Sequence, residues 1–245
     1  MTDAPGTPSG RGIQAVLPTL GMRRPVERLE LFSTPVCIVR MGDDERLGEL
    51  NRALTQHFVA ESLTHSGVDR SNAGGWHSTP DLAQRADPLF RAATDLVVGR
   101  VRACLAELMR PADETPRYGL SVHGWAMVMR DGDHIVLHDH AESHWAVAYY
   151  SDAGNAHLAG FPDSGLLAIV DPRRGSARTP QSDVSATTFT VRPESGMLVL
   201  FPGFLQHYVH PYRGSRPRVS LSFNLVVHPE PAVHPAGRPD GTSAG

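Results

Sequence analysis

The sequence predicts an α+β protein in which helices pack on one face of a barrel-like or jelly-roll double sheet. Up to about residue 110, apolar residues recur at helical spacing, whereas short strand patterns separated by turn sequences follow from about residue 118. Strands and helices do not alternate along the chain. Segregated layers are therefore favoured over a parallel sheet with crossover helices.

The helical part is expected at about residues 43–110, after a first strand in the segment LELFSTPVCIVRM. The next segment, DDERLGELNRALTQHFVAESLTH, has acidic residues in its first turn and apolar residues at helical spacing. A second helical region, residues 78–109, begins with a Ser/Thr cap and has Pro80 just inside. Pro88 is expected to break or restart it.

The β part is expected to form a core over about residues 118–227. Turn sequences such as DGD, DAGN, PDSG and PESG separate eight short segments rich in β-branched and aromatic residues. The expected strands are 120–130, 134–140, 145–151, 165–171, 187–192, 196–202, 207–212 and 218–227.

Length and composition favour one domain. The 245 residues can bury a sizeable core, which we expect at 13–227, between disordered ends at 1–12 and 228–245 that are rich in Pro, Gly and small polar residues. Cys37 and Cys104 lack a CxxC spacing and are expected to be small buried hydrophobes.

Charge and residue usage exclude several classes of function. The formal charge of −3 gives no reason to expect nucleic acid, and the absence of lysine excludes Schiff-base, pyridoxal-phosphate and P-loop chemistry. The N-terminus lacks the basic and apolar regions of a secretory signal, and no apolar run approaches the roughly 20 residues of a membrane helix. A cytoplasmic protein is expected.

A histidine cluster marks the candidate site. The segment GDHIVLHDHAESHW, residues 132–145, contains four histidines, and imidazole is the commonest side-chain metal ligand. On an extended strand, His134, His138 and His140 fall on one face while Asp139 points to the other. His138 and His140 are near enough to share an ion, whereas His134 is less able to reach it. A third ligand must come from another strand.

That third ligand is expected to be His207, which follows an apolar strand and a Pro-Gly turn. Further on, Arg218 and Ser220 share one face of a strand, and Val219 and Leu221 face the other layer. A buried arginine needs an anionic partner, and a carboxylate fits its guanidinium bidentately. The residues thus predict a metal bound by three imidazoles, with an anionic ligand held by the arginine and the serine.

The pattern H-x-H…H…R-x-S resembles that of the Fe(II)/2-oxoglutarate-dependent oxygenases, which have a double-stranded β-helix, the cupin-like form of the jelly roll. The chain is most similar to a bacterial branch of 2OG-Fe(II) oxygenases with an H-x-H pair. The likeness runs over roughly residues 30 to 227. It rests on LFSTPV, GGWHS, HDH before the YY strand, VDPR, VRPESGMLVLFPGFLQHYVHPY and RVSLSFN.

The resemblance implies Fe(II) bound by His138, His140 and His207, with 2-oxoglutarate and O2 as cosubstrates. It also implies that Arg218, assisted by Ser220, binds the far carboxylate of 2-oxoglutarate. The implied reaction is hydroxylation of a small molecule, or its desaturation or oxidative cyclisation, as in a tailoring enzyme for an amino acid or peptide in bacterial secondary metabolism. The expected partner is that small molecule, without nucleic acid or membrane, and a homodimer is compatible with this.

Three departures from the family pattern stand out. The superfamily usually has a carboxylate where His140 stands, so three histidines replace the usual two histidines and one carboxylate. Trp145 and Ala146 occupy the place of a usual Ser-Gly pair, which alters the pocket wall. Met129 stands where many relatives have a tyrosine that contacts the cosubstrate.

Several roles stay open in the sequence. Glu142 and His144 are minority candidates for the metal site, and one of Tyr149 and Tyr150 should point into the barrel. The tryptophans Trp76, Trp125 and Trp145 are expected to pack in the core, and Trp145 is the one candidate for the site, because it follows the ligand strand. The remaining histidines of the folded part are expected to be structural, with a minority reading in which His77 lines the mouth: His57, His65, His77, His123, His134, His157 and His210.

Two other functions remain to be weighed. A cupin-type metal enzyme that does not use 2-oxoglutarate would fit the G-x5-H-x-H spacing of Gly132, His138 and His140. Against it, Glu142 comes too early, no asparagine follows His207 at the required spacing, and Arg218 would have no role. The other alternative is a non-catalytic jelly-roll module that binds a ligand or partner. Succinate formation from 2-oxoglutarate would separate the oxygenase from both.

Overall fold

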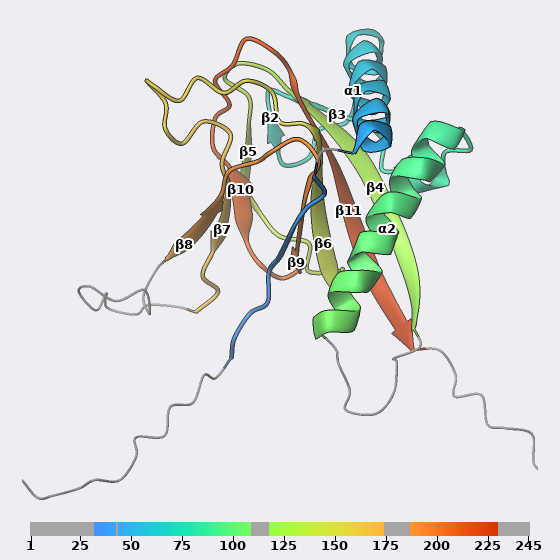
Figure 1. Ribbon diagram of the computed structural model, residues 1–245. Coiled ribbons are helices and arrows are strands. Elements are labelled where there is room, and N and C mark those ends of the chain that lie inside the picture. The colour runs from blue at the N-terminus through green and yellow to red at the C-terminus, as the bar shows by residue number, and fades with distance from the viewer. Residues whose placement is uncertain (1–31, 43, 109–117, 174–186, 230–245) are drawn as a thin grey trace, which may run out of the picture. The chain divides into compact units, whose positions relative to one another are not determined.

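The computed structural model describes residues 32–42, 44–108, 118–173 and 187–229, and the described residues from Thr34 onward form one compact unit. Its described strands form two antiparallel sheets, one of six strands and one of five, and two α-helices pack on the six-stranded sheet (Figure 1). This arrangement is a double-stranded β-helix with its helices on one side, so the expected α+β fold class is confirmed.

The helices begin where the sequence provides caps. Helix α1 spans Glu45–Thr64, and the carboxylate of Asp44 accepts hydrogen bonds from the first backbone N–H groups of the helix. The expected second helical region is divided into the short 3-10 helix η1, Leu82–Gln84, and helix α2, Pro88–Leu108. Pro88 is thus a helix start, because its ring disfavours a helical residue before it and costs nothing at the first helical position.

The two sheets contain all eight strands expected for the β part, and three more. In spatial order the six-stranded sheet consists of β1 (Cys37–Arg40), β9 (Met197–Pro202), β6 (Trp145–Asp152), β11 (Arg218–Pro229), β4 (Tyr118–Met129) and β3 (Trp76–His77). The five-stranded sheet consists of β2 (Asn72–Ala73), β5 (His134–His138), β10 (His207–Val209), β7 (Leu167–Val170) and β8 (Thr188–Val191). Strand β1 lies in the expected first strand segment, while the two-residue strands β2 and β3 were not expected.

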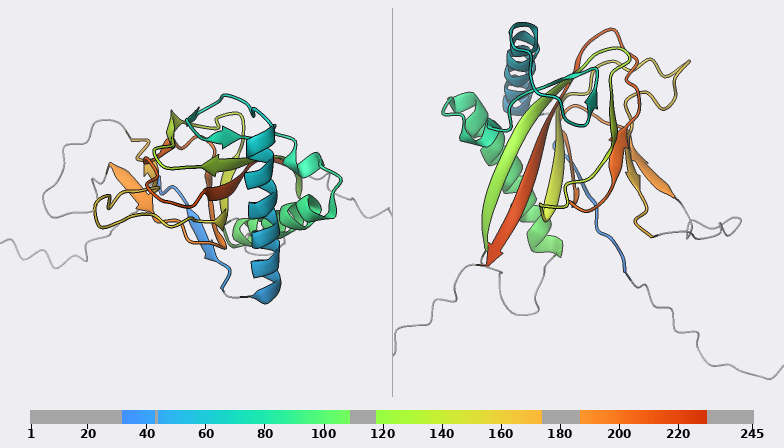
Figure 2. Two further views of the ribbon diagram at one scale, coloured as in Figure 1. Left: turned by 90° about the horizontal axis from the view of Figure 1, so that it is seen from above. Right: turned by 180° about the vertical axis from the view of Figure 1, so that it is seen from behind.

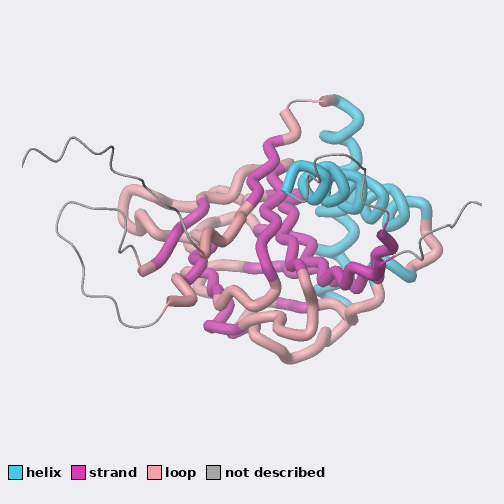
Figure 3. The backbone as a smooth tube through the Cα atoms, turned by 90° about the horizontal axis from the view of Figure 1, so that it is seen from below, coloured by secondary structure: helices cyan, strands magenta, loops and turns pink. Residues whose placement is uncertain are grey.

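The hydrophobic core has two layers, one on each side of the six-stranded sheet. One layer lies between this sheet and the helices, which Figure 2 shows together on the far side from the five-stranded sheet. The other lies between the two sheets. The smooth trace in Figure 3 shows the same segregation of helices and strands. Residues from both sheets meet in this second layer.

Strand β11 runs along the centre of this arrangement and pairs with β4 over its full length. Phe223 of β11 is fully buried in the helix-side layer, and it explains why residue 124 is glycine. A Cβ atom at Gly124 would lie 2.6 Å from Cδ1 of the Phe223 ring, which is closer than two carbon atoms can approach.

The C-terminal strand of the fold extends slightly beyond the boundary expected from the sequence. Strand β11 ends at Pro229, two residues beyond the expected limit of 227. Of the segments expected to be disordered, 1–12 and 228–245, His228 and Pro229 belong to β11, and the other residues lie outside the described ranges. Cys104 is buried in the helix-side layer and Cys37 packs against it, as expected for apolar cysteines. Among the described helices, none has the length and apolarity needed to cross a membrane.

Candidate metal centre

Strands β5 and β10 bring two of the histidines side by side. They pair antiparallel in the five-stranded sheet, with His138 directly opposite His207. His140 follows the end of β5, and its backbone N–H donates to the carbonyl of Gly203 at 2.8 Å. A Cβ atom at Gly203 would lie 2.6 Å from the His140 carbonyl oxygen and 2.2 Å from that of Ser143. The glycine of the Pro-Gly turn is therefore what allows this close approach.

The three imidazoles converge. One ring nitrogen from each of His138, His140 and His207 lies within 4.8 Å of the others. The ring centroids are 4.2 Å apart for the cross-strand pair and 5.0 and 5.1 Å from His140 to the other two. An ion bound at the usual metal–imidazole distance of about 2.1 Å needs only small ring movements to contact all three. The donor set fits a divalent metal ion such as Fe(II).

The backbone fixes the orientation of two rings. Nδ1 of His138 lies 2.8 Å from the carbonyl oxygen of Val136, and Nδ1 of His207 lies 2.9 Å from that of Leu205. A carbonyl oxygen can only accept, so each Nδ1 must carry the proton. Nε2 then has a free lone pair, which is the form that binds a metal.

Burial also keeps the rings neutral. Loss of solvent, followed by the repulsion of the neighbouring His138, lowers the pKa of His207 to about 3 and that of His140 to about 4. Burial likewise lowers the pKa of His138. At neutral pH all three rings are therefore unprotonated, so no proton has to be displaced before an ion binds.

The position of His134 corrects one expectation from the sequence. His138 is opposite His207, but the residue opposite Val209 is Ile135, so three steps on β5 match two on β10. Val136 and Leu137 form this bulge, and both are about half exposed. Ile135 and His138 consequently line the space between the sheets, and His134 does not. The expectation that His134 shares a face with the two clustered histidines of its segment is wrong.

Arg218 lies deep in the same cavity and lacks an anionic partner among the described residues. Its side chain is almost fully buried, and Nη1 donates to the carbonyl of Gly165 at 3.0 Å. The guanidinium carbon lies 5.0 Å from the centroid of the Tyr150 ring, and Nε has no hydrogen-bond partner within the described ranges. A buried cation with an unused donor is suited to a carboxylate that enters from the cavity.

The alternation expected along β11 and β6 is observed. Arg218 and Ser220 line the cavity, while Val219 and Leu221 pack in the helix-side layer. The open question about the two tyrosines is resolved in the same way. Tyr150 faces the cavity, and Tyr149 faces the helices and donates its hydroxyl hydrogen to Asn51 of α1.

Several other candidates lie away from the cavity. Glu142 is exposed and outside the three-histidine group. His144 is also exposed, and its Nδ1 accepts a hydrogen bond from the backbone N–H of Val227, so it secures β11. Arg173 pairs with Asp171 at 2.6 Å.

The tryptophan that reaches the site is Trp125, not Trp145. Trp145 packs against the helix-side layer, because its alternation on β6 points it away from the cavity. Trp125 lines the cavity, with its ring centroid 5.7 Å from that of His140. Buried His77 stacks on it at 5.3 Å with 12° between the rings. The sequence contained a signal for this position. Trp125 shares a face of β4 with Met129, which stands where many relatives have a tyrosine that contacts the cosubstrate.

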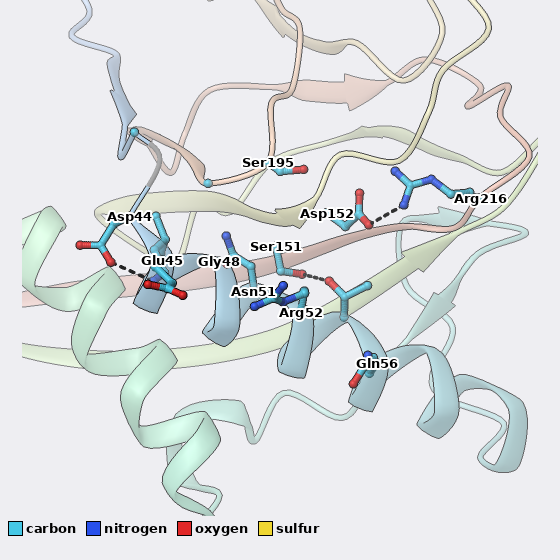
Figure 4. A pocket seen from close by; sticks show the side chains of 14 residues that line it. Asp44, Glu45, Gly48, Asn51, Arg52, Gln56, Ser151, Asp152, Ser195 and Arg216 are labelled. Atoms are coloured by element: carbon cyan, nitrogen blue, oxygen red, sulfur yellow. Dashed lines mark hydrogen bonds and ion pairs between the residues drawn. The ribbon is translucent and has the colours of Figure 1, made fainter.

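A larger groove lies elsewhere on the molecule. It has a volume of about 790 Å³ and runs between the first half of α1 and the end of β6 (Figure 4). Its lining mixes both signs of charge, including an ion pair of 3.4 Å between Arg216 and Asp152. None of the three clustered histidines lines it.

Comparison with known proteins supports the chemistry of the smaller cavity. A family model described as "Putative 2OG-Fe(II) oxygenase" matches residues 123–224, a range that contains the three histidines, Arg218 and Ser220. No protein of curated function shows significant sequence similarity to this chain.

Solved structures share the fold at low sequence identity. A prolyl-4-hydroxylase from Pseudomonas putida is 13% identical, with a TM-score of 0.53 over 81% of this chain and 95% of that chain. HygX from Streptomyces hygroscopicus, solved with nickel and 2-oxoglutarate, is 15% identical, with a TM-score of 0.51 and coverage of 79% and 83%. SnoK, an α-ketoglutarate-dependent carbocyclase from nogalamycin biosynthesis, is 12% identical, with a TM-score of 0.54 and coverage of 82% and 83%.

The structural likeness identifies the double-stranded β-helix, and the family match covers the strands that carry the histidine cluster and the buried arginine. Residues 123–224 are therefore similar in sequence to the 2OG-Fe(II) oxygenases, and the chain shares the double-stranded β-helix of these solved structures.

Proposed function

We propose that this chain is an Fe(II)/2-oxoglutarate-dependent oxygenase, which binds its iron through His138, His140 and His207 and binds 2-oxoglutarate through Arg218, with Ser220 assisting. The observation that carries the proposal is the convergence of three ring nitrogens within 4.8 Å in a cavity whose lining also includes the buried arginine. An unpaired guanidinium is costly to bury, and a dicarboxylate would compensate for it.

Fe(II), 2-oxoglutarate and O2 together supply the oxidation of a substrate C–H bond, with succinate and CO2 as the other products. The protein contributes the arrangement. Three neutral imidazoles leave the charge of the ion uncompensated, so they favour binding of a dianion more than a site with a carboxylate ligand would. Arg218 fixes the far end of that dianion, and the apolar walls around Tyr150 keep water away from it.

The proposed substrate is a small molecule, with an amino acid or peptide intermediate as the leading class, and its proposed fate is hydroxylation, desaturation or oxidative cyclisation. Support comes from the range of reactions among proteins with this fold, since one neighbour is named as a prolyl hydroxylase and another as a carbocyclase. We further propose that the enzyme acts in the cytoplasm, where 2-oxoglutarate is produced. It needs neither nucleic acid nor membrane, and a homodimer is compatible with a site built from one chain.

The test is anaerobic addition of Fe(II) and 2-oxoglutarate, followed by absorption spectroscopy for the metal-to-ligand charge-transfer band and, after admission of air, by assay of succinate. The wild-type protein should give both signals, and His207→Ala should give neither. His144→Ala is the matched control, because this exposed histidine lies four positions from His140 but outside the cluster. Metal binding without succinate would favour the cupin-type alternative, and absence of metal binding would favour a non-catalytic module.

A further inference from the structure

The three clustered histidines are not held in the same way. His138 and His207 each donate from Nδ1 to the backbone carbonyl of the residue two positions earlier. His140 has no such bond in the described part of the chain. Its Nδ1 instead lies 3.5 Å from Nδ2 of the Asn224 side chain. The ring that stands where the superfamily usually has a carboxylate is thus the one whose orientation depends on another side chain.

Asn224 belongs to the row of polar side chains that faces the space between the sheets. On β11 it follows Arg218, Ser220 and Ser222 at intervals of two, and it pairs with Ala146 of β6 across the sheet. Its Oδ1 is buried and has no hydrogen-bond partner among the described residues. Burial of an amide oxygen without a partner is unfavourable, so a nearby donor for this oxygen would stabilise the site.

The ring of His140 can supply that donor. The oxygen and nitrogen of an amide have nearly the same shape, so the two orientations of Asn224 are chosen by hydrogen bonding. With Nδ2–H directed at Nδ1 of His140, the neutral ring must carry its proton on Nε2. With the amide turned over, Oδ1 accepts from Nδ1–H, and His140 adopts the same tautomer as His138 and His207.

We propose that Asn224 is a positioning residue for the metal centre: its amide oxygen accepts from Nδ1–H of His140 and leaves Nε2 free for the ion. The inference rests on the proposed function, in which His140 is a ligand. It also gives a reason for an amide at this position. A carboxylate ligand has no tautomers to select, whereas an imidazole ligand that lacks a backbone acceptor needs one from a side chain.

The test is a calorimetric titration of the full-length apoprotein with Co(II), an air-stable probe for the iron site. Asn224→Leu keeps the size of the side chain but removes the acceptor, and it should weaken Co(II) binding by about 10- to 100-fold. Asn224→Asp restores an acceptor and should bind Co(II) at least as tightly as the wild type. Nitrogen-15 chemical shifts should show the Nδ1–H tautomer of His140 in the wild-type apoprotein and its loss in Asn224→Leu.

Asn51→Leu is the matched control. Asn51 accepts a hydrogen bond from Tyr149 on the opposite side of the same sheet, so its loss should lower the thermal unfolding temperature without changing Co(II) affinity. The inference is overturned if Asn224→Leu binds Co(II) as tightly as the wild type, or if Asn224→Asp binds as weakly as Asn224→Leu. Should the wild type itself fail to bind Co(II), the proposed function is refuted and the inference with it.

Discussion

The two faces of β11 have different roles, although they consist of alternate residues of one strand. The face toward the helices is apolar and buried, and it consists of Val219, Leu221, Phe223 and Leu225. The face toward the other sheet is polar, and it consists of Arg218, Ser220, Ser222 and Asn224. The residues that stabilise the fold and those proposed to bind ligands are therefore separated by a single step along the chain. Substitutions on one face should change unfolding, and those on or opposite the other face should change ligand binding.

The largest effect is expected from His207→Ala, because the His207 side chain on β10 faces the polar row of β11. Removal of one of three ligands should weaken Fe(II) binding more than the roughly 10- to 100-fold typical of residues that only support a ligand. Succinate formation should fall with it. Metal titration and an activity assay measure both quantities. A variant that keeps wild-type iron affinity would show that this ring is not a ligand.

Phe223→Ala tests the apolar face of β11, which packs against the helices. The ring is fully buried against the helices, and its truncation should lower the free energy of unfolding by about 3–5 kcal/mol. The folded fraction should bind metal as the wild type does, because the ring lies across the sheet from the cavity. Urea denaturation and metal titration at low temperature measure the two effects. Loss of metal affinity in folded protein would mean that the two faces are coupled.

Arg218→Leu separates the cosubstrate from the metal. We expect 2-oxoglutarate affinity to fall by about 30- to 1000-fold, equivalent to about 2–4 kcal/mol for a buried charge pair. Metal affinity should persist. The apoprotein should unfold at the same or a higher urea concentration, because the buried guanidinium has no ion-pair partner among the described residues. A large loss of stability in this variant would contradict the proposal that Arg218 binds the cosubstrate and does not stabilise the fold.

The smallest effect is a dependence of apoprotein stability on pH. Burial lowers the pKa of His140 to about 4 and that of His207 to about 3, below the ordinary value of 6.5 that the unfolded chain should show. As the pH falls below about 6.5, the unfolded chain binds protons that the folded protein does not, so stability is lost. Urea midpoints should decrease from pH 7 to pH 5, and His207→Ala should flatten this decrease. An increase toward low pH would contradict the burial of these rings.

Much of this organisation was predictable from the sequence because it follows a local rule. The alternation of Arg218 and Ser220 with Val219 and Leu221 needs only the period of a strand. The same rule, extended along SLSFN, would have placed Asn224 on the polar face, but nothing in the sequence indicates that the ring of His140 lies beside it. That contact arises from pairing between distant strands.

The rest depended on irregular or non-local structure. The bulge at Val136 and Leu137 displaces His134 from the expected face, and the residues of a bulge resemble those of a regular strand. The two-residue strands β2 and β3 have no local signal of their own, because neighbouring strands impose them. The stack of His77 on Trp125 joins segments far apart in the sequence, so neither residue alone indicates it.

The hydrogen bonds from His138 and His207 to backbone carbonyls affect how the protein should respond to loss of its metal ion. Both are made within the polypeptide and do not require an ion, so two of the three proposed ligands should keep their orientation if iron is withdrawn. A chelator or a period of iron starvation should therefore empty the protein without dismantling it. Activity should return on resupply within the time of simple diffusion, with no need for fresh synthesis.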